Sequence, residues 1–240
     1  MKANKDEFRN KVWEALSEQK LGRFPFPLKG RIPNFKGAEK AAAFVKELEF
    51  YKKAKVVKVN PDSPQLPLRA EVLKDGKTLL IPTPRLKAGF VMIKPEWVPS
   101  GEERKAASLK HMNTYGKEIP LSEMPQIDLI VVGSVAIHPD GRRLGKGEGY
   151  ADREYAIIRE LGNPEVPVIT TVNSIQVVKD NLPKDEYDLT VDWIVTEEGV
   201  NEVQSNYEKP KGIIWSEVTE EELEAMPVLA EIREMMGRQK

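Results

Sequence analysis

Cysteine is absent from the 240 residues of the chain, and histidine occurs only twice. Without cysteine the protein has no disulfide, no catalytic thiolate and no thiolate-ligated zinc. The two histidines, His111 and His138, leave little for a histidine-based metal centre. These chemistries are therefore excluded before any motif is considered.

The chain also lacks an excess of charge of either sign. It carries 37 basic and 38 acidic side chains, which gives a net charge of −1. Proteins that coat nucleic acids or bind membrane surfaces usually have a basic field, so we expect no DNA or membrane partner, and the balance argues against RNA. Any anion site must be local. The 31% of charged residues resembles the composition of thermophile proteins.

Long apolar runs are missing as well. The amino-terminal stretch MKANKDEFRNKVW has no apolar signal core, and no segment reaches the length of a membrane span. These absences predict a soluble, cytoplasmic protein.

The hydrophobic pattern predicts a single α/β domain. A chain of this length with 40% apolar residues can bury one substantial core. Continuous Val/Ile runs between helical segments favour a mainly parallel central sheet covered on both faces, a three-layer α/β/α fold that binds ligands at strand carboxyl ends. The expected helices are residues 5–19, 38–54, 66–74 and 151–161, and the expected strands are residues 55–59, 78–82, 89–93, 127–137, 166–172 and 191–196.

Three segments lie outside this alternation. Residues 21–37 contain three prolines, three glycines and three phenylalanines, which indicates an ordered, packed loop. Residues 95–126 are polar and irregular and form either a lid or a surface excursion. Residues 206–240 are expected to be a C-terminal extension packed on the domain, with a strand-like piece at 212–215, a helix start at Thr219 and a helix break near Pro227.

The stretch 140–155, DGRRLGKGEGYADREY, is the most informative functional feature. It connects an expected strand to an expected helix, where an α/β protein usually holds an anion. Glycines let the backbone bring N–H groups close to a ligand, cations add charge, and the helix offers its positive end. The glycines are Gly145, Gly147 and Gly149, and the nearest cations are Arg142, Arg143 and Lys146. A polyphosphate fits this chemistry.

The spacing of this stretch leaves alternatives open. GKGEG is neither the pattern GxxxxGK[ST] nor the pattern GxGxxG, and a solvent-exposed glycine loop has the same appearance. Asp152 in the first turn of the following helix either caps that helix or holds a magnesium ion that bridges phosphates. Arg143 either contacts phosphate or pairs with Asp140 or Glu148.

Three motifs in this order resemble the 5-formyltetrahydrofolate cyclo-ligase family, also called 5,10-methenyltetrahydrofolate synthetases. They are the Lys5-x-x-x-Arg9 pair, RLGxGxGYxD, and Q…LPxxxxDxxVDxIVTE, and together they span about residues 5 to 200. The segment FPxPxxxRIPNFKGA at 24–38, with GYAD in place of GYYD, is more similar to the branch of methenyltetrahydrofolate synthetase domain-containing proteins.

The resemblance implies an ATP- and Mg²⁺-dependent ring closure. In that family ATP phosphorylates the N5-formyl oxygen of 5-formyltetrahydrofolate, N10 attacks the activated carbon, and phosphate leaves to give 5,10-methenyltetrahydrofolate. The resemblance implies Arg143 and Lys146 as catalytic residues, Asp152 as the metal ligand, and a reduced folate or pterin as substrate of a monomer or homodimer. The implied ATP-binding residues are Lys5, Arg9, Arg142, Arg143, Leu144, Gly145, Lys146, Gly147, Glu148, Gly149 and Tyr150.

Two departures from the family pattern keep other functions in view. Ala151 stands where cyclo-ligases have a second tyrosine, and the family's Glu-Pro pair before the central strand is absent. A non-catalytic ATP- or phosphate-binding protein of the same fold accommodates both changes. The basic stretch 29–40 suggests an RNA-associated accessory protein, which the near-zero net charge opposes. A sugar-phosphate isomerase is weaker still, because no base carboxylate at a strand end is identifiable.

Overall fold

An eight-stranded sheet organises residues 2–238, the part of the chain that the computed structural model describes. Its strands are β1 (Val56–Val59), β2 (Thr78–Pro82), β3 (Phe90–Ile93), β4 (Lys117–Ile119), β5 (Leu129–Val132), β8 (Val168–Thr171), β9 (Trp193–Thr196) and β10 (Gly199–Glu202). The order is β10-β9-β8-β5-β1-β2-β3-β4. The five strands from β9 to β2 are parallel, and antiparallel pairing is confined to the two edges. The expected mainly parallel sheet is confirmed.

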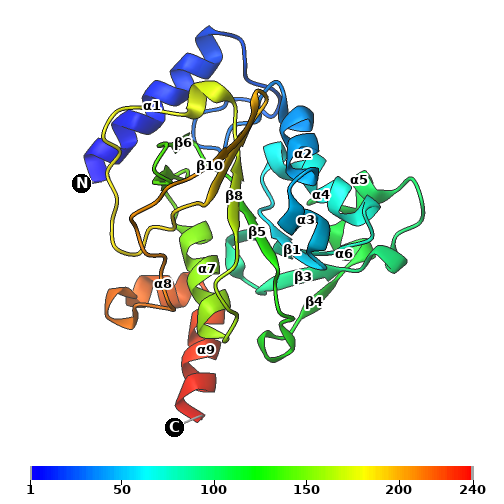
Figure 1. The fold of residues 1–240 in the computed structure, drawn as a ribbon. Coiled ribbons are helices and arrows are strands. Elements are labelled where there is room, and N and C mark those ends of the chain that lie inside the picture. The colour runs from blue at the N-terminus through cyan, green and yellow to red at the C-terminus, as the bar shows by residue number, and fades with distance from the viewer. Residues whose placement is uncertain (1, 239–240) are drawn as a thin grey trace.

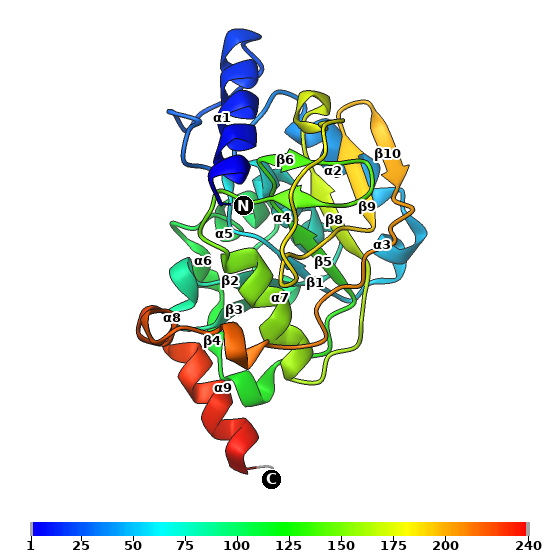
Figure 2. The same cartoon turned by 90° about the vertical axis from the view of Figure 1, so that its left-hand side faces the viewer.

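Helices cover both faces of this sheet (Figure 1), as the three-layer expectation requires. One face carries α2 (Ala38–Lys46), α3 (Glu49–Lys53), α4 (Leu66–Lys74), α5 (Glu103–Ala106) and α6 (Met112–Tyr115). The other face carries α7 (Tyr150–Glu160) and α9 (Pro227–Arg238), which Figure 2 shows in front of the sheet, with α8 (Glu220–Ala225) beside them. The first helix, α1 (Lys2–Glu18), lies at one end of the sheet. None of the described helices is long and apolar enough to cross a membrane.

Strand alternation divides the interior into two main cores. Side chains such as Val57 and Leu129 point toward α2 and α4, whereas Ile130 and Val168 point toward α7 and α9. A third cluster lies under α1, where buried Leu16 packs with residues of the hairpin described below. The site is built where these three cores meet the carboxyl edge of the sheet.

One central strand position breaks the apolar pattern. Lys58 of β1 lies between Leu80 and Ile130 of the neighbouring strands and is 1% exposed. Its Nζ donates to Asn60 Oδ1 at 2.6 Å and to Glu154 Oε2 of α7. Burial raises the pKa of the Glu154 carboxyl, and the Lys58 ammonium opposes that shift. Because a buried charge is costly unless paired, this ion pair ties α7 to β1 in one register.

The sequence pattern predicts one strand over residues 127–137, but the structure has two short strands there. β5 ends at Val132, and the chain leaves the sheet before β6 (Ala136–Ile137), which pairs with β7 (Arg143–Leu144) in a separate hairpin. At the break, a Cβ on Gly133 would lie 2.8 Å from Ile32 Cγ2. The turn therefore requires glycine, and it leads the chain to the glycine-rich stretch, residues 140–149, at the sheet edge.

Other segments also differ from the pattern. The expected helix at 38–54 is interrupted at Leu48, whose extended backbone redirects α3 so that buried Tyr51 donates to Asp75 at 2.8 Å. The expected strand at 212–215 is wrong, because the Ile213 N–H bonds the Glu160 side chain rather than a strand. The edge strands β4 and β10 were not expected, since neither has an apolar run.

The remaining segments are packed rather than loose. Residues 95–126 form α5, α6 and β4 against α4 and β3, and Leu109 of this segment lines the cavity described below. In the loop 21–37, Phe35 is buried while Phe24 and Phe26 are exposed. In the tail, Thr219 and Glu222 form a capping box at the start of α8, and the helix breaks before Pro227, as predicted.

The Lys58–Glu154 pair yields a stability prediction. Glu154→Leu alone should lower the free energy of unfolding by about 3–5 kcal/mol, because it leaves a buried ammonium without its counter-ion. The double variant Lys58→Met/Glu154→Leu should recover most of this loss, since it replaces the pair by apolar volume. Urea denaturation measures both. A double variant as unstable as the single one would contradict the assignment of the cost to the unpaired charge.

Candidate functional site

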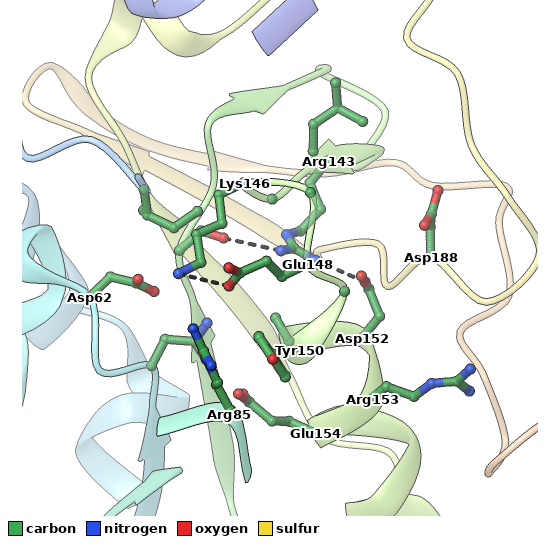
Figure 3. Close-up of a pocket in the computed structure, with 18 of the residues that line it drawn as sticks. Asp62, Arg85, Arg143, Lys146, Glu148, Tyr150, Asp152, Arg153, Glu154 and Asp188 are labelled. Carbon is green, nitrogen blue, oxygen red and sulfur yellow. Dashed lines mark hydrogen bonds and ion pairs between the residues drawn. The ribbon is translucent and has the colours of Figure 1, made fainter. Parts of the chain in front are cut away.

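A cavity of about 930 Å³ lies at the carboxyl ends of β1, β2 and β5 (Figure 3). Its walls come from α1, the loop 25–32, the segments that follow β1 and β2, the glycine-rich stretch, the start of α7, and residues 185–188 and 210–222. This is the sheet edge where the parallel pattern predicted a ligand. The glycine-rich stretch is therefore part of a cavity wall and not an isolated surface loop.

The backbone of the glycine-rich stretch opens the positive end of α7 toward the cavity. Gly147 and Gly149 have φ of 111° and 73°, in the left-handed region that favours glycine. Gly149 is the N-cap of α7, and no side chain caps the helix there. The first N–H groups of an 11-residue helix therefore remain available to an anion, which the helix dipole also favours.

Arg143 lies beneath this stretch with its guanidinium buried. Its Nη1 donates to Asp152 Oδ1 at 3.0 Å and its Nη2 to the Gly133 carbonyl at 3.2 Å, the two interactions drawn in Figure 3. The Nε atom is buried and has no partner among the described residues. Arg143 lines the cavity, so the structure favours an inward role over the expected alternatives of pairing with Asp140 or Glu148.

The structure does not bring Arg142 into the cavity. Successive side chains of an extended strand point to opposite sides, so Arg142 faces away from the cavity that Arg143 lines. It pairs with Asp140 at 2.9 Å and donates to Asn181 Oδ1 at 2.7 Å. These contacts, together with the Tyr207 ring, give Arg142 a role in holding the hairpin turn.

Lys146 faces the cavity between two carboxylates. Its Nζ lies 2.9 Å from Glu148 Oε2, and Asp62 lies on the opposite side in Figure 3. Burial raises the pKa of the Asp62 carboxyl, and the Lys146 charge acts against that shift. Asp62 makes no side-chain hydrogen bond or ion pair with any residue that the structure describes. Lys146 is thus a partly exposed cation that a phosphate can reach.

The two cations of α1 have different surroundings. Arg9 donates from Nε to the Gly145 carbonyl at 2.7 Å, so it holds the glycine-rich stretch directly. Lys5 donates to Asp185 and Asp188 at 2.7 and 2.6 Å. Burial lowers the pKa of Lys5, but these two carboxylates outweigh burial and raise it. Both line the cavity, and Lys5 anchors α1 to the segment 185–188.

Asp152 does not cap α7, one of the two roles that its position allowed. Its Oδ1 accepts from Arg143 and from the Leu189 N–H, the latter at 2.9 Å. Burial raises the pKa of the Asp152 carboxyl, and Arg143 opposes the shift. Its other oxygen accepts no hydrogen bond from the described residues. Asp152 therefore positions Arg143 and retains one oxygen for a further ligand.

The donor set fits magnesium better than a metal that needs a full protein cage. Among residues 2–238 no group of three or more His, Asp or Glu side chains gathers in metal-binding geometry. Magnesium usually takes one or two carboxylates and fills its remaining positions with water and substrate phosphates. Asp152, with one oxygen unused, and Asp62, with both unused, supply such carboxylates on the cavity wall.

The remaining residues that were expected at the site either line the cavity or support the β6–β7 hairpin. Tyr150 in the first turn of α7 and Glu148 line the cavity, as do the backbones of Gly145, Gly147 and Gly149. Leu144 also borders the cavity, but its side chain is buried in the cluster beneath α1. Its carbonyl accepts from the Val135 N–H at 2.7 Å, which closes the hairpin.

Sequence reasoning missed part of the site. Asp62 and Arg85 line the cavity from the segments that follow β1 and β2, and a charged residue within a few positions after a strand of a parallel sheet is the signal that could have found them. Lys58 inside an otherwise apolar strand was a signal for buried polar chemistry. The contributions of residues 25–32 and 210–222 carried no local signal, because only the folded chain brings them to the cavity.

Comparison with known proteins places the chain among similar sequences and folds. It is 42% identical over 240 residues to the methenyltetrahydrofolate synthase domain-containing protein of Bos taurus and 40% identical over 240 residues to that of Homo sapiens. Each match covers 96% of this chain, and the chain spans 62% and 61% of those relatives. The NMR structure of the Aquifex aeolicus 5,10-methenyltetrahydrofolate synthetase aligns with a TM-score of 0.54 at 26% identity, over 85% of this chain and 95% of that one.

A family model also matches most of the chain. The model of the 5-formyltetrahydrofolate cyclo-ligase family covers residues 1–197, which include α1, the glycine-rich stretch and the segment 185–188. The resemblance that the motifs indicate is confirmed by the model and by the relatives. The chain belongs to the 5-formyltetrahydrofolate cyclo-ligase family.

Proposed function

We propose that this protein closes the ring of 5-formyltetrahydrofolate, or of a related reduced pterin, to 5,10-methenyltetrahydrofolate in a reaction that consumes ATP and requires Mg²⁺. The observation that carries the proposal is the buried Arg143 beneath the uncapped positive end of α7. Together with Lys146, these groups form a cradle for a polyphosphate. The cavity of about 930 Å³ has room for a second ligand beside it.

The proposed chemistry needs positioning and charge neutralisation more than covalent catalysis. Transfer of the terminal phosphoryl group to the formyl oxygen places negative charge on the transferring oxygens. Arg143, held by Asp152 and Gly133, is preorganised to meet that charge, because its partners fix the guanidinium before the reaction begins. Lys146 would exchange Glu148 for phosphate, and Arg9 would keep the glycine-rich stretch in place through Gly145.

Magnesium, when bound, would neutralise the phosphates and align them for transfer. Asp152 would hold it through the oxygen that accepts no hydrogen bond, and Asp62 would be a second carboxylate on the cavity wall. In this proposal Asp152 contacts both the Arg143 guanidinium and the magnesium ion. The phosphates would therefore lie against both positive charges.

Ala151, which stands where cyclo-ligases have a second tyrosine, affects the part of the cavity that is proposed to bind the substrate. Ala151 lines the cavity directly after Tyr150, so the lost tyrosine leaves open space rather than a gap in the core. The proposal therefore includes a related pterin as an alternative to 5-formyltetrahydrofolate. We also propose that residues 206–240 are an extension of a single domain, because Ile213, Met226 and Leu229 share a buried cluster with β5 and α7.

A second candidate function is a phosphate-binding protein without turnover. The observation that favours it is the Lys146–Glu148 ion pair, which already satisfies the most exposed cation of the cradle. Such a protein would bind ATP in the same cavity. It would differ only in giving no product.

Formation of product decides between these functions. Purified protein mixed with 5-formyltetrahydrofolate, ATP and Mg²⁺ should produce the near-ultraviolet absorbance of methenyltetrahydrofolate, and omission of ATP or of Mg²⁺ should abolish the rise. ATP binding detected by calorimetry without any such rise would instead support the non-catalytic binder.

Adjacent arginines provide a matched pair for the phosphate cradle. Arg143→Ala should lower kcat by about a hundredfold to a thousandfold, because it removes a preorganised donor to developing charge. Arg142→Ala should leave kcat near the wild-type value, since Arg142 faces Asp140 and Asn181. Steady-state kinetics on both variants, with thermal unfolding as a control for the fold, makes the comparison. Equal losses in the two variants would remove Arg143 from its proposed role.

Lys146 is expected to act chiefly in binding. Its side chain is partly exposed and, within residues 2–238, is held by Glu148 alone, so Lys146→Ala should raise the Kd for ATP by about tenfold through loss of one charge-assisted contact. The melting temperature should stay close to that of the wild type. Calorimetric titration with ATP measures the first effect, and an unfolded variant would show that the residue supports the loop instead.

A further inference from the structure

Glu154 presents an acceptor to the cavity that no residue of the described chain uses. Its Oε2 accepts from Lys58, and this is the hydrogen bond that its carboxylate makes within residues 2–238. Its other oxygen, Oε1, is not among the atoms that are both buried and unpartnered. Since Glu154 also lines the cavity, the unused Oε1 faces the cavity space.

The neighbours of Glu154 leave this oxygen accessible. Ala151 precedes Glu154 by three residues on α7 and therefore lies on the same face of the helix, and both residues line the cavity. Lys58 pairs with the carboxylate and fixes its position; burial raises the pKa of this carboxyl, and the Lys58 charge opposes that shift. A carboxyl oxygen that is held in place at the edge of an open space is an arrangement that recognises an N–H donor of a ligand.

A cation lines the cavity near this acceptor. Arg85 belongs to a short 3-10 turn, residues 84–86, that packs against α7 and lines the same cavity. Figure 3 shows Arg85 beside the Tyr150 ring and Glu154 below that ring. The Arg85 side chain makes no ion pair or hydrogen bond with any residue that the structure describes. An acceptor and a donor thus flank one space, with an aromatic ring beside them.

A flat ring with an amino group and a carbonyl group on one edge matches this pair. The 2-amino-4-oxopyrimidine edge, which pterins and guanine share, offers an N–H donor for Glu154 and a carbonyl acceptor for Arg85, and its face can stack on Tyr150. Resting on the proposed function, we infer that Glu154 is a specificity-determining residue whose Oε1 accepts a hydrogen bond from the exocyclic amino group of the pterin ring.

The two ligands that test this inference differ at position 2 of the ring and at the proton of the neighbouring N1. Pterin carries the 2-amino group, and lumazine carries a carbonyl at that position, whose oxygen lone pairs would face the carboxylate and be repelled by it. Wild-type protein should bind pterin about a hundredfold more tightly than lumazine, because a site built for a donor rejects an analogue without it. Fluorescence titration without ATP measures both affinities.

Two variants separate recognition from folding. Glu154→Gln keeps the shape and an oxygen for Lys58 but adds an amide donor, so the preference for pterin over lumazine should disappear. The variant Lys58→Met/Glu154→Leu removes both charges and should also show no preference. A merely structural Glu154 would change both affinities together and leave their ratio intact. Equal wild-type affinities, or a preference that survives in Glu154→Gln, would overturn the inference.

The source of the ring is tested by competition. Guanosine carries the same edge, and we expect it to displace bound pterin only at concentrations well above the Kd for pterin. Displacement at lower concentrations would overturn the pterin assignment in favour of a guanine ligand.

This inference can fail apart from the proposed function. If the wild type forms no methenyltetrahydrofolate but prefers pterin as predicted, the role of Glu154 stands and the cyclo-ligase proposal fails. If turnover occurs and Glu154→Gln leaves the KM for 5-formyltetrahydrofolate unchanged, the role of Glu154 fails alone.

Discussion

The site depends on Arg143, which joins elements that are distant in sequence. Its guanidinium links the Gly133 carbonyl after β5 to Asp152 on α7, and Asp152 in turn accepts from the Leu189 N–H. The glycine-rich stretch crosses directly above this contact and enters α7 without a side-chain cap. Because the ion pair is buried, the arrangement is stable only when each charge keeps its partner. The geometry of the phosphate cradle therefore follows from one interaction beneath it.

Buried charge is concentrated at one edge of an otherwise apolar sheet. Lys58 and Glu154 lie on the side of β1 and α7 that borders the cavity, and Arg143 and Asp152 lie one step further toward α1. Replacement of such pairs by apolar side chains is often neutral or stabilising in a fold, so stability alone does not explain them. Their position suggests a division of the cavity, with cations for phosphates near the glycine-rich stretch and a single acceptor for a ring beside Arg85.

The sequence predicted the features that arise from local patterns. Continuous Val/Ile runs gave the parallel core of the sheet, and the glycine spacing located the start of α7 within one residue. It could not predict contacts between distant segments. Nothing local distinguishes Arg142 from Arg143, because strand alternation decides which one faces inward only once β7 pairs with β6. The break at Gly133 depends on Ile32, which comes from another part of the chain. The position of the Glu154 carboxylate depends on Lys58, which lies on a distant strand.

The central claim is that this cavity transfers a phosphoryl group from ATP to the formyl oxygen of a bound reduced folate. It is tested most directly with 5-formyltetrahydrofolate that carries a heavy isotope of oxygen in the formyl group. After one turnover with unlabelled ATP, mass spectrometry of the released phosphate should find the heavy oxygen in it, because the carbon–oxygen bond breaks when N10 closes the ring. Phosphate released without the label would show that ATP is hydrolysed by water, and it would contradict the account.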